Sequence, residues 1–348
     1  MAAYMRRRLA WLVPSFLGIT LVVFLAVHLA PGDPALRESF DPDAGAADAA
    51  DIERFRAEHL LDRPLLVQYL HFLGPFDLSP RGPRWLGGSG EHPLGGLLAL
   101  DLGSEFRRPH VRIVDELGRR LAVTAPLTLA AALLAWGIAI PLGAWSALRR
   151  GSKRERGVAL GLFALHSLPG FWLALVLVLV FGAAGLGWLP VLGLHSAGAG
   201  ELGWFDWTLD LVRHSILPVL ALALGSLAYL ARQVRAAMLD ALGQEYVITA
   251  RSKGLSERAV VLRHALRNAL LPAITLAALI LPALVGGSVI VETIFGLPGM
   301  GRYAYEALLE RDYAVIQAVT ALSALVTLLA LLVSDVLYAL ADPRIRHD

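Results

Sequence analysis

The most patterned polar stretch of the chain is Glu245–Pro272, which reads EYVITARSKGLSERAVVLRHALRNALLP. Gly254 interrupts a helix-compatible run and permits a turn with positive φ. Ser256 can then cap a short helix over residues 257–266. Val260 and the two apolar residues after it have nothing to bury against in a bare loop. The pattern indicates a docking element for a cytosolic partner, and a solvated basic loop is the alternative.

The sequence contains no recognised catalytic or metal-binding motif. It contains no H-E-x-x-H, G-x-S-x-G or G-x-x-x-x-G-K-[ST] motif, so ATP binding in the usual way is not expected. The absence of Cys excludes thiol nucleophiles and Cys–zinc sites. Five histidines show no metal-ligand spacing, and we assign them structural roles: His28, His166, His195, His214 and His264. We therefore predict a chain that is not an enzyme and has no metal site.

A second motif, Leu165–Trp172 (LHSLPGFW), lies inside an apolar stretch. Pro169 lacks a backbone donor and Gly170 weakens a helix, so the helix should kink or break there. Broken spans often line a cavity, but Pro is also simply more frequent in transmembrane helices. The candidate pathway-lining residues are Ser167, Pro169, Phe171, Trp172, Gly286 and Ser288. For Asp335, which also lies in an apolar stretch, we favour pairing with an Arg over an ion pathway.

The composition places these motifs in a membrane protein. Hydrophobic residues make up 56% of the 348-residue chain and charged residues 17%, against about 25% charged in soluble domains. A single soluble core cannot hide so much apolar surface, and a disordered chain or disulfide scaffold is excluded too. The net charge of +2 gives no indication of nucleic-acid binding.

Crossing the hydrocarbon core takes about 20 mostly apolar helical residues. Six stretches meet this requirement: Leu9–Ala30, Leu121–Leu148, Val158–Ala184, His214–Leu230, Ala269–Val291 and Val315–Ala341. The first is too long for a cleaved signal peptide, whose apolar region is about 7–15 residues, so we interpret it as a signal anchor.

The basic residues orient these spans. With the N-terminus inside, the inner segments carry 17 Lys and Arg against six acids, and the short outer loops carry only Arg213, Arg302 and Arg311. Positive residues concentrate on the cytoplasmic side. Both termini and the stretch 231–268 are therefore predicted to be cytoplasmic.

The outer segment 31–120 is too polar to span a membrane. Apolar residues at near-helical spacing over Ile52–Leu73 predict short amphipathic helices. The Gly- and Pro-rich stretch Gly74–Gly96 predicts an irregular loop.

The stretch Glu245–Pro272 resembles the EAA loop of the membrane subunits of bacterial ABC importers, most closely the form in dipeptide and oligopeptide (and nickel) permeases. The matching residues are Glu245-Tyr246, Ala250-Arg251, Lys253-Gly254-Leu255, His264-Ala265-Leu266-Arg267-Asn268 and Leu271-Pro272. Further stretches similar to the B-type subunit follow in order: Met5–Pro34, Leu61–Leu73, Asp101–Val111, SLPGFW, Glu292–Gly301, Arg311–Gln317 and Asp335–His347. The resemblance covers nearly the whole chain.

Three departures from the family pattern stand outside the loop. Gly74–Leu100 looks like an insertion, which leaves the shape of the external region open. Ala314 stands where the family often has Pro, and Asp342 where it often has Asn.

The resemblance implies an all-α integral membrane protein with six transmembrane helices, the type I ABC importer permease fold and cytoplasmic termini. It implies a multi-pass location in the bacterial cytoplasmic (inner) membrane. The implied partners are a homologous second permease subunit forming a heterodimer, two cytosolic ATPase subunits, an external solute-binding protein and membrane lipid. ATP and Mg²⁺ would bind the ATPase subunits, and this chain would hold no cofactor.

The resemblance also implies a coupling helix near Gly254–Leu266 that seats in a groove of one ATPase. The expected coupling residues are Glu245, Tyr246, Ala250, Arg251, Lys253, Gly254, Leu255, Ser256, Glu257, Val260, His264, Arg267 and Asn268. Glu245 and Arg251 are expected to help hold the first helix of the loop.

Short peptides are the favoured cargo, with nickel chelates, glutathione or sugars as alternatives in the same importer class. A stand-alone secondary transporter or channel is the rival class, but it would be expected to carry more intramembrane acids or an inverted repeat. We divide the chain into the N-terminus and first span (1–30), the external region (31–120), the permease core (121–341) and a cytoplasmic tail (342–348).

Overall fold

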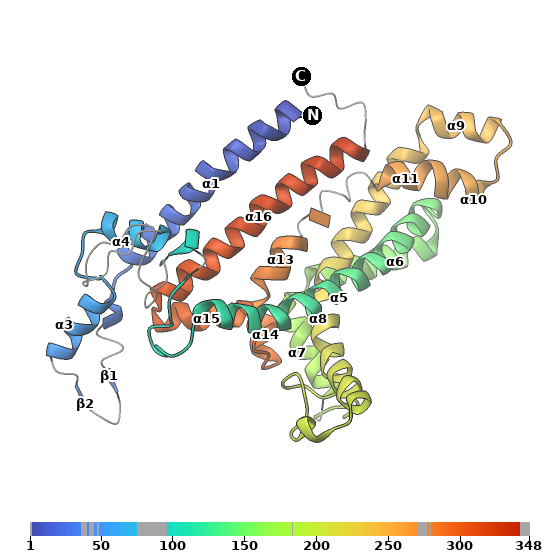
Figure 1. Cartoon of the computed structure of the whole chain (residues 1–348). Coiled ribbons are helices and arrows are strands. Elements are labelled where there is room, and N and C mark those ends of the chain that lie inside the picture. The colour runs from blue at the N-terminus through green and yellow to red at the C-terminus, as the bar shows by residue number, and fades with distance from the viewer. Residues whose placement is uncertain are drawn as a thin grey trace. The chain divides into compact units, whose positions relative to one another are not determined.

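The computed structural model describes residues 2–35, 40–41, 45–46, 49–74, 96–99, 101–182, 184–270, 277–278 and 280–341. These residues are mostly helical (Figure 1), and the strands among them are one antiparallel pair of two residues each, β1 (Phe40–Asp41) and β2 (Gly45–Ala46). The chain divides into two compact units. Unit 1 contains the described residues within 123–302 and 329–341, and unit 2 contains those within 2–122 and 303–328.

Four helices of the described part are long and apolar enough to cross a membrane: α1 (Ala2–Leu29), α5 (Ile113–Leu148), α8 (Trp204–Leu242) and α16 (Tyr313–Ala341). They correspond to the predicted first, second, fourth and sixth spans. The second and fourth begin earlier than predicted, because polar turns such as the one at Asp115 and Glu116 continue the helix beyond the apolar stretch.

The predicted third span is broken where the sequence indicated. Helices α6 (Lys153–Ser167) and α7 (Gly170–Phe181) meet at an angle of 102°. Leu168 has extended backbone with ψ 132° and Pro169 is the N-cap of α7. Proline disfavours the helical region for the residue before it, and Gly170 weakens the helix further, so the break agrees with the sequence. Counting this pair as one span gives five candidates.

The predicted fifth span, Ala269–Val291, is divided in the described residues. Its described parts are the end of α11 (Leu266–Ala269), then α13 (Ile280–Gly286) and the start of α14 (Val289–Ile294). Gly287 has φ +63° and separates α13 from α14. Residues 271–276 and 279 lie outside the described residues.

Within unit 1, small residues bring α5 and α8 close together. Ala131, Ala135 and Ala139 follow one face of α5 and are buried in a cluster with Leu227 and Ala231 of α8. A Cβ placed on Gly143 would lie 2.7 Å from the carbonyl oxygen of Ala231. Close backbone approach at small residues is typical of helices that pack in a membrane.

Within unit 2, the predicted amphipathic helices of the external segment are confirmed as α3 (Ala49–Glu58) and α4 (Leu65–Leu73). The buried Tyr69 of α4 donates to the carbonyl oxygen of Leu17 at 3.0 Å, and its hydroxyl lies 3.0 Å from that of Thr20. These bonds fasten α4 to α1. The Gly- and Pro-rich stretch predicted as a loop lies, over residues 75–95, outside the described residues.

The remaining short elements connect these helices. They are η1 (Leu97–Ala99), η2 (Ala199–Glu201) and α15 (Met300–Glu310). The segment after α8, described next, comprises α9 (Glu245–Ser252), α10 (Glu257–Ala259), the π-helix η3 (Val260–Ala265) and α11.

Candidate functional site

We refer to residues 245–269 as the α9–α11 segment. It begins directly after α8, whose last turn is closed by Gly243 donating to Asp240 at 3.3 Å. Helix α9 then returns, a turn follows at Gly254, and a second helical stretch runs from Glu257 to Ala269. This is the helix, glycine turn and short helix that the sequence predicted.

The turn at Gly254 is a Schellman motif that only glycine fits comfortably. Gly254 has φ +77°. Its amide donates to Arg251 at 2.9 Å, and the amide of Leu255 donates to Ala250 at 3.4 Å. A Cβ at Gly254 would meet nothing within 4 Å. The requirement for glycine therefore comes from the backbone conformation alone.

Two polar contacts fix the helix that leaves the turn. The Ser256 hydroxyl accepts from the amide of Ala259 at 3.4 Å, which confirms the predicted N-cap. Arg251 donates to Glu257 through Nε at 2.7 Å, and this contact raises the pKa of Arg251. Both side chains are exposed, so the pair contributes little stability. It joins α9 to the helix beyond Gly254.

The second helical stretch contains a π-helix between two short α-helical pieces. The amides of η3 make the wider π pattern over Val260–Ala265, and α11 continues to Ala269. Such bulges are rare and occur often at functional sites.

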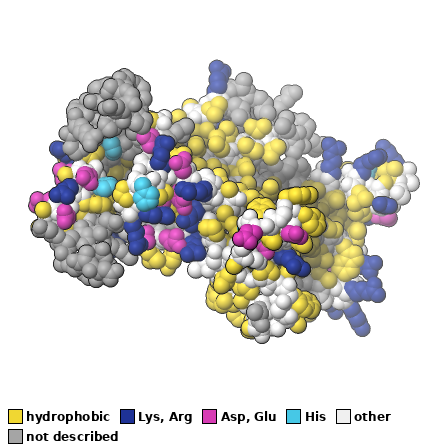
Figure 2. Space-filling model, turned by 60° about the horizontal axis from the view of Figure 1, so that its bottom comes forward, with side chains coloured by type: hydrophobic (Ala, Val, Ile, Leu, Met, Phe, Trp, Pro, Cys, Tyr) yellow, Lys and Arg dark blue, Asp and Glu magenta, His cyan; other side chains and the backbone are white. Residues whose placement is uncertain are grey.

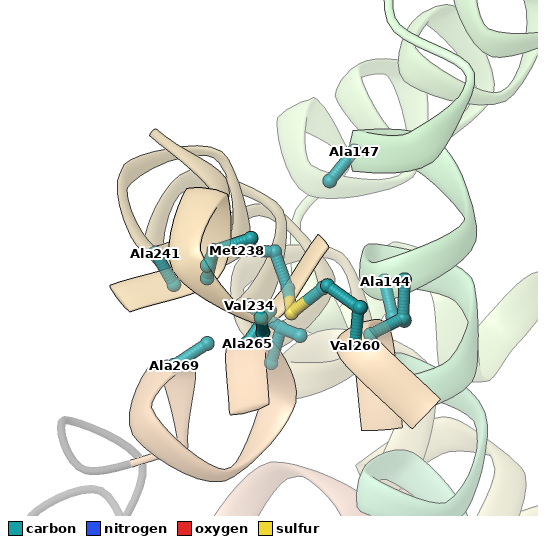
Figure 3. Packing of buried hydrophobic residues seen from close by; sticks show 11 residues of the cluster. Ala144, Ala147, Val234, Met238, Ala241, Val260, Ala265 and Ala269 are labelled. Carbon is teal, nitrogen blue, oxygen red and sulfur yellow. The ribbon is translucent and has the colours of Figure 1, made fainter. Parts of the chain in front are cut away.

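The segment is anchored from beneath by a buried apolar cluster (Figure 3). The labelled side chains gather around Met238, which is fully buried. The cluster draws on α5, α8, α9, η3 and α11: Ala144, Ala147, Val234, Met238, Ala241, Val247, Ala250, Val260, Val261, Ala265 and Ala269.

The expectation that Val260 and Val261 have nothing to bury against was therefore wrong. They are 0% and 8% exposed because α8 continues past its predicted apolar stretch to Leu242, and its last turns, with Ala144 and Ala147 of α5, supply an apolar surface. These two valines hold the segment in place and do not face outward.

The outward surface of the segment combines apolar and basic side chains. Tyr246, Ile248, Leu255 and Leu262 are between 39% and 56% exposed. The exposed basic residues are Arg251, Lys253, Arg258, Arg263 and Arg267. Lys and Arg side chains also gather at the right of the space-filling view in Figure 2, where α9 and α10 lie in Figure 1.

The predicted coupling residues divide into exposed and anchoring sets. Ala250 and Val260 are buried and His264 is half-buried. The others are exposed: Glu245, Tyr246, Arg251, Lys253, Gly254, Leu255, Ser256, Glu257, Arg267 and Asn268.

The exposed Ile248 was missed by the sequence analysis. A signal was available, because Ile248 lies three residues before Arg251, and this spacing places both side chains on one face of α9. The buried Val247 and Ala250, again three residues apart, lie on a different face, about 100° around the helix. Ile248 therefore belongs to the outward surface with Arg251.

The candidate pathway residues lie at two helix breaks in unit 1. Ser167, Pro169, Phe171 and Trp172 are exposed at the break between α6 and α7. Gly286 and Ser288 are half-buried at the break between α13 and α14. Helix α14 packs against α7, so the two breaks belong to neighbouring elements.

A buried carboxylate that the candidate list omitted organises the second break. Glu292 is 4% exposed. It accepts from the Thr124 hydroxyl at 2.9 Å and from the Arg302 amide at 2.8 Å, at the start of α15. A Cβ on Gly287 or Gly299 would lie 2.3 Å from this carboxyl group. The sequence signal was an acid shortly before the glycine-rich run GLPGMG.

Unit 2 has its own buried carboxyl group at the corner between α15 and α16. Asp312 is 5% exposed, and its side chain accepts from the amides of Phe106 at 2.7 Å and Val315 at 3.1 Å. Burial raises the pKa of Asp312 to about 6. Nearby, Tyr303 donates to the buried Glu105 at 2.9 Å. These bonds tie the segment around Phe106 to the start of α16.

Several apolar helices able to cross a membrane, together with an anchored basic loop, are typical of an integral membrane protein. The family model described as "Binding-protein-dependent transport system inner membrane component" matches residues 139–347. The chain belongs to this family and is a multi-pass protein of the cytoplasmic membrane. The family is the permease component of ABC importers, in which separate subunits hydrolyse ATP.

The particular relatives are peptide permease proteins. The chain is 38% identical over 347 residues to the oligopeptide transport system permease protein AppB of Bacillus subtilis, with 100% of both chains covered. It is 36% identical over 368 residues to the di/tripeptide transport system permease protein DppB of Pseudomonas aeruginosa, again with full coverage. It is 34% identical over 373 residues to the dipeptide transport system permease protein DppB of Escherichia coli, covering 100% of this chain and 99% of that protein.

Proposed function

We propose that this chain is the transmembrane subunit of an ATP-driven importer of short peptides and that its α9–α11 segment is the coupling element for a cytosolic ATPase. The observation that carries the proposal is the division of that segment into an anchored face and an exposed face. Val247 and Val260 are fully buried, while Leu255 and Leu262 are 43% and 52% exposed. An element built this way transmits force, because movement of the outer face must move α5 and α8.

The wider arrangement completes the proposal. Six membrane crossings in the type I importer arrangement would place both termini and the α9–α11 segment in the cytoplasm. A homologous second permease subunit would share the pathway, and an external solute-binding protein would deliver the cargo. Two ATPase subunits would bind ATP and Mg²⁺, so no cofactor is assigned to this chain.

Short peptides are the proposed cargo because the relatives are named for oligopeptides, di/tripeptides and dipeptides. Nickel chelates, glutathione and sugars are the alternatives within the same importer class. Uptake of labelled di- and tripeptides should depend on this chain. Uptake of nickel chelate, glutathione or sugar with no peptide uptake would contradict the peptide assignment.

The coupling proposal is tested by changing the exposed face without touching the anchor. Leu255→Glu combined with Leu262→Glu should abolish co-purification of the ATPase subunits with the assembled permease, because two charges enter an apolar contact. Arg54→Gln, which removes an exposed ion-paired arginine of α3, is the matched control and should retain them. Normal ATPase co-purification by the double variant would refute the assignment.

A further inference from the structure

The strongest charged patch outside the α9–α11 segment lies where α5 ends and α6 begins. Five of the eight residues from 149 to 156 are basic and all five are exposed: Arg149, Arg150, Lys153, Arg154 and Arg156. We call these five residues the α5–α6 corner.

The one acidic residue among residues 149–156 is buried. Glu155 is 5% exposed and pairs with Arg235 of α8 at 2.9 Å. Its other carboxylate oxygen accepts from the Gly151 amide at 3.3 Å, and its own amide donates to Ser152 at 3.1 Å. Glu155 is therefore neutralised by groups other than the five exposed cations, which keep their full positive charge.

The corner continues into an apolar stripe along α6. Lys153, Arg156, Leu160 and Phe163 are spaced by three, four and three residues, which places them on one helix face. Leu160 and Phe163 are 69% and 61% exposed. At 1.5 Å per residue they lie about 10 and 15 Å along the helix from Lys153. Cations at one end and apolar side chains deeper along the same face match the two parts of a phospholipid.

An aromatic ring marks the level of the polar–apolar boundary. The guanidinium of Arg149 lies 5.3 Å from the centre of the Trp145 ring. Trp is enriched where lipid headgroups meet the hydrocarbon region. A cytosolic protein surface would satisfy the cations but not the exposed apolar side chains two turns deeper.

We propose that the α5–α6 corner is a docking site for an anionic phospholipid headgroup, with the acyl chain along Leu160 and Phe163. The proposal rests on the membrane orientation given under the proposed function, which places this corner at the cytoplasmic leaflet. Basic clusters next to a membrane span attract anionic lipids by about 1 kcal/mol per Lys or Arg, which is about fivefold in affinity per charge.

The test measures lipid retained by the purified full chain. Native mass spectrometry should show retained phosphatidylglycerol in excess of phosphatidylcholine, and this excess should fall as NaCl rises because salt screens exposed charges. Arg149→Gln with Arg150→Gln and Lys153→Gln should reduce phosphatidylglycerol binding about a hundredfold. The control Arg258→Gln with Arg263→Gln and Arg267→Gln removes the same charge elsewhere and should retain the lipid.

Three outcomes would overturn the proposal. The wild-type chain could retain both lipids equally, its binding of phosphatidylglycerol could resist salt, or the corner variant could bind the lipid as the wild type does. In the last case, loss of ATPase co-purification by the corner variant would make the corner a protein contact. Thermal unfolding of both triple variants controls for folding, and the salt dependence is measured on the wild type alone. Failure of lipid binding leaves the Leu255 and Leu262 test of coupling unaffected.

Discussion

Single residues in the α9–α11 segment have separable roles. Gly254 supplies a backbone conformation, with φ +77° and open space around its Cα. Arg251 and Glu257 join the two sides of the turn. The buried Val260 anchors the segment, whereas Leu262, two residues later, is half exposed. The residue types alone did not separate anchoring from exposed positions, because both valines and Leu262 are apolar.

Gly254→Val should uncouple the segment while leaving membrane insertion intact. A left-handed conformation costs an L-residue about 1–2 kcal/mol, and β-branching adds to it, so the turn should open. Stimulation of ATPase activity and transport by the variant should be lost. Gly118→Val is the matched control, because Gly118 is helical and a Cβ there meets nothing within 4 Å. Transport and ATPase stimulation equal to wild type in Gly254→Val would contradict the role of the turn.

Asp312 should make unit 2 sensitive to pH. Because burial raises its pKa to about 6, its protonated form is favoured by folding. The stabilisation is present below the unfolded pKa of about 4 and is lost as pH rises through about 6. The loss is at most about 3 kcal/mol, since each pKa unit corresponds to 1.36 kcal/mol.

Asp312→Asn should remove this pH dependence, because the amide carries no charge, although its single oxygen can accept only one of the two hydrogen bonds. Thermal unfolding of the purified chain at pH 5 and pH 7.5 measures the change in stability between these pH values. Asp62→Asn, a change at an exposed position, is the control. The wild type should lose more stability than Asp312→Asn between these two values. An identical loss in the two proteins would show that Asp312 does not titrate in this range.

At the scale of elements, the sequence predicted where helices are interrupted better than it predicted where they begin and end. The interruption at Pro169 and the turn at Gly254 follow from backbone chemistry local to those residues, and both were predicted. The polar turns at the ends of α5 and α8 were not, because apolar stretches mark the hydrocarbon core and not the helix ends. The buried cluster beneath the α9–α11 segment escaped prediction for the same reason, since Met238 lies beyond the apolar part of α8. Glu292 was passed over because its hydrogen-bond partners, Thr124 and Arg302, are remote in sequence.

Matched truncations in the α9–α11 segment should separate its contribution to stability from its contribution to ATPase docking. Val260→Ala removes buried methyl groups and should lower the free energy of unfolding by about 2 kcal/mol. Leu262→Ala truncates an exposed side chain, so it should leave stability unchanged and weaken ATPase co-purification. Thermal unfolding and co-purification of each variant provide the measurements. Equal loss of stability in both would contradict the division into anchored and exposed faces.

At the scale of the whole molecule, the near-neutral net charge hides a strong asymmetry between predicted sides. This asymmetry predicts that residue 255 is cytoplasmic and residue 54 external. The chain has no Cys, so single substitutions can be labelled without background. In intact cells stripped of the outer membrane, an impermeant maleimide should label Arg54→Cys and not Leu255→Cys. The reverse pattern would invert the proposed topology.

Family membership and the membrane location follow from patterns that extend over the whole sequence, which is why they could be predicted without a structure. Cargo could not be predicted in the same way, because the candidate pathway residues at the breaks near Pro169 and Ser288 carry no chemistry specific to one ligand. The proposed ATPase-docking surface lies between these cases: its location was predicted from the sequence, and which of its side chains are exposed follows from the buried cluster.

The central claim is that the exposed face of the α9–α11 segment contacts an ATPase subunit. The most direct measurement is cysteine cross-linking in membranes containing the assembled importer, with Leu255→Cys or Leu262→Cys in this chain and a bifunctional thiol reagent of short span. We predict a cross-linked product with the ATPase from both positions and none from the external control Arg54→Cys. A folded, assembled importer that gives no ATPase cross-link from either leucine position would contradict the account.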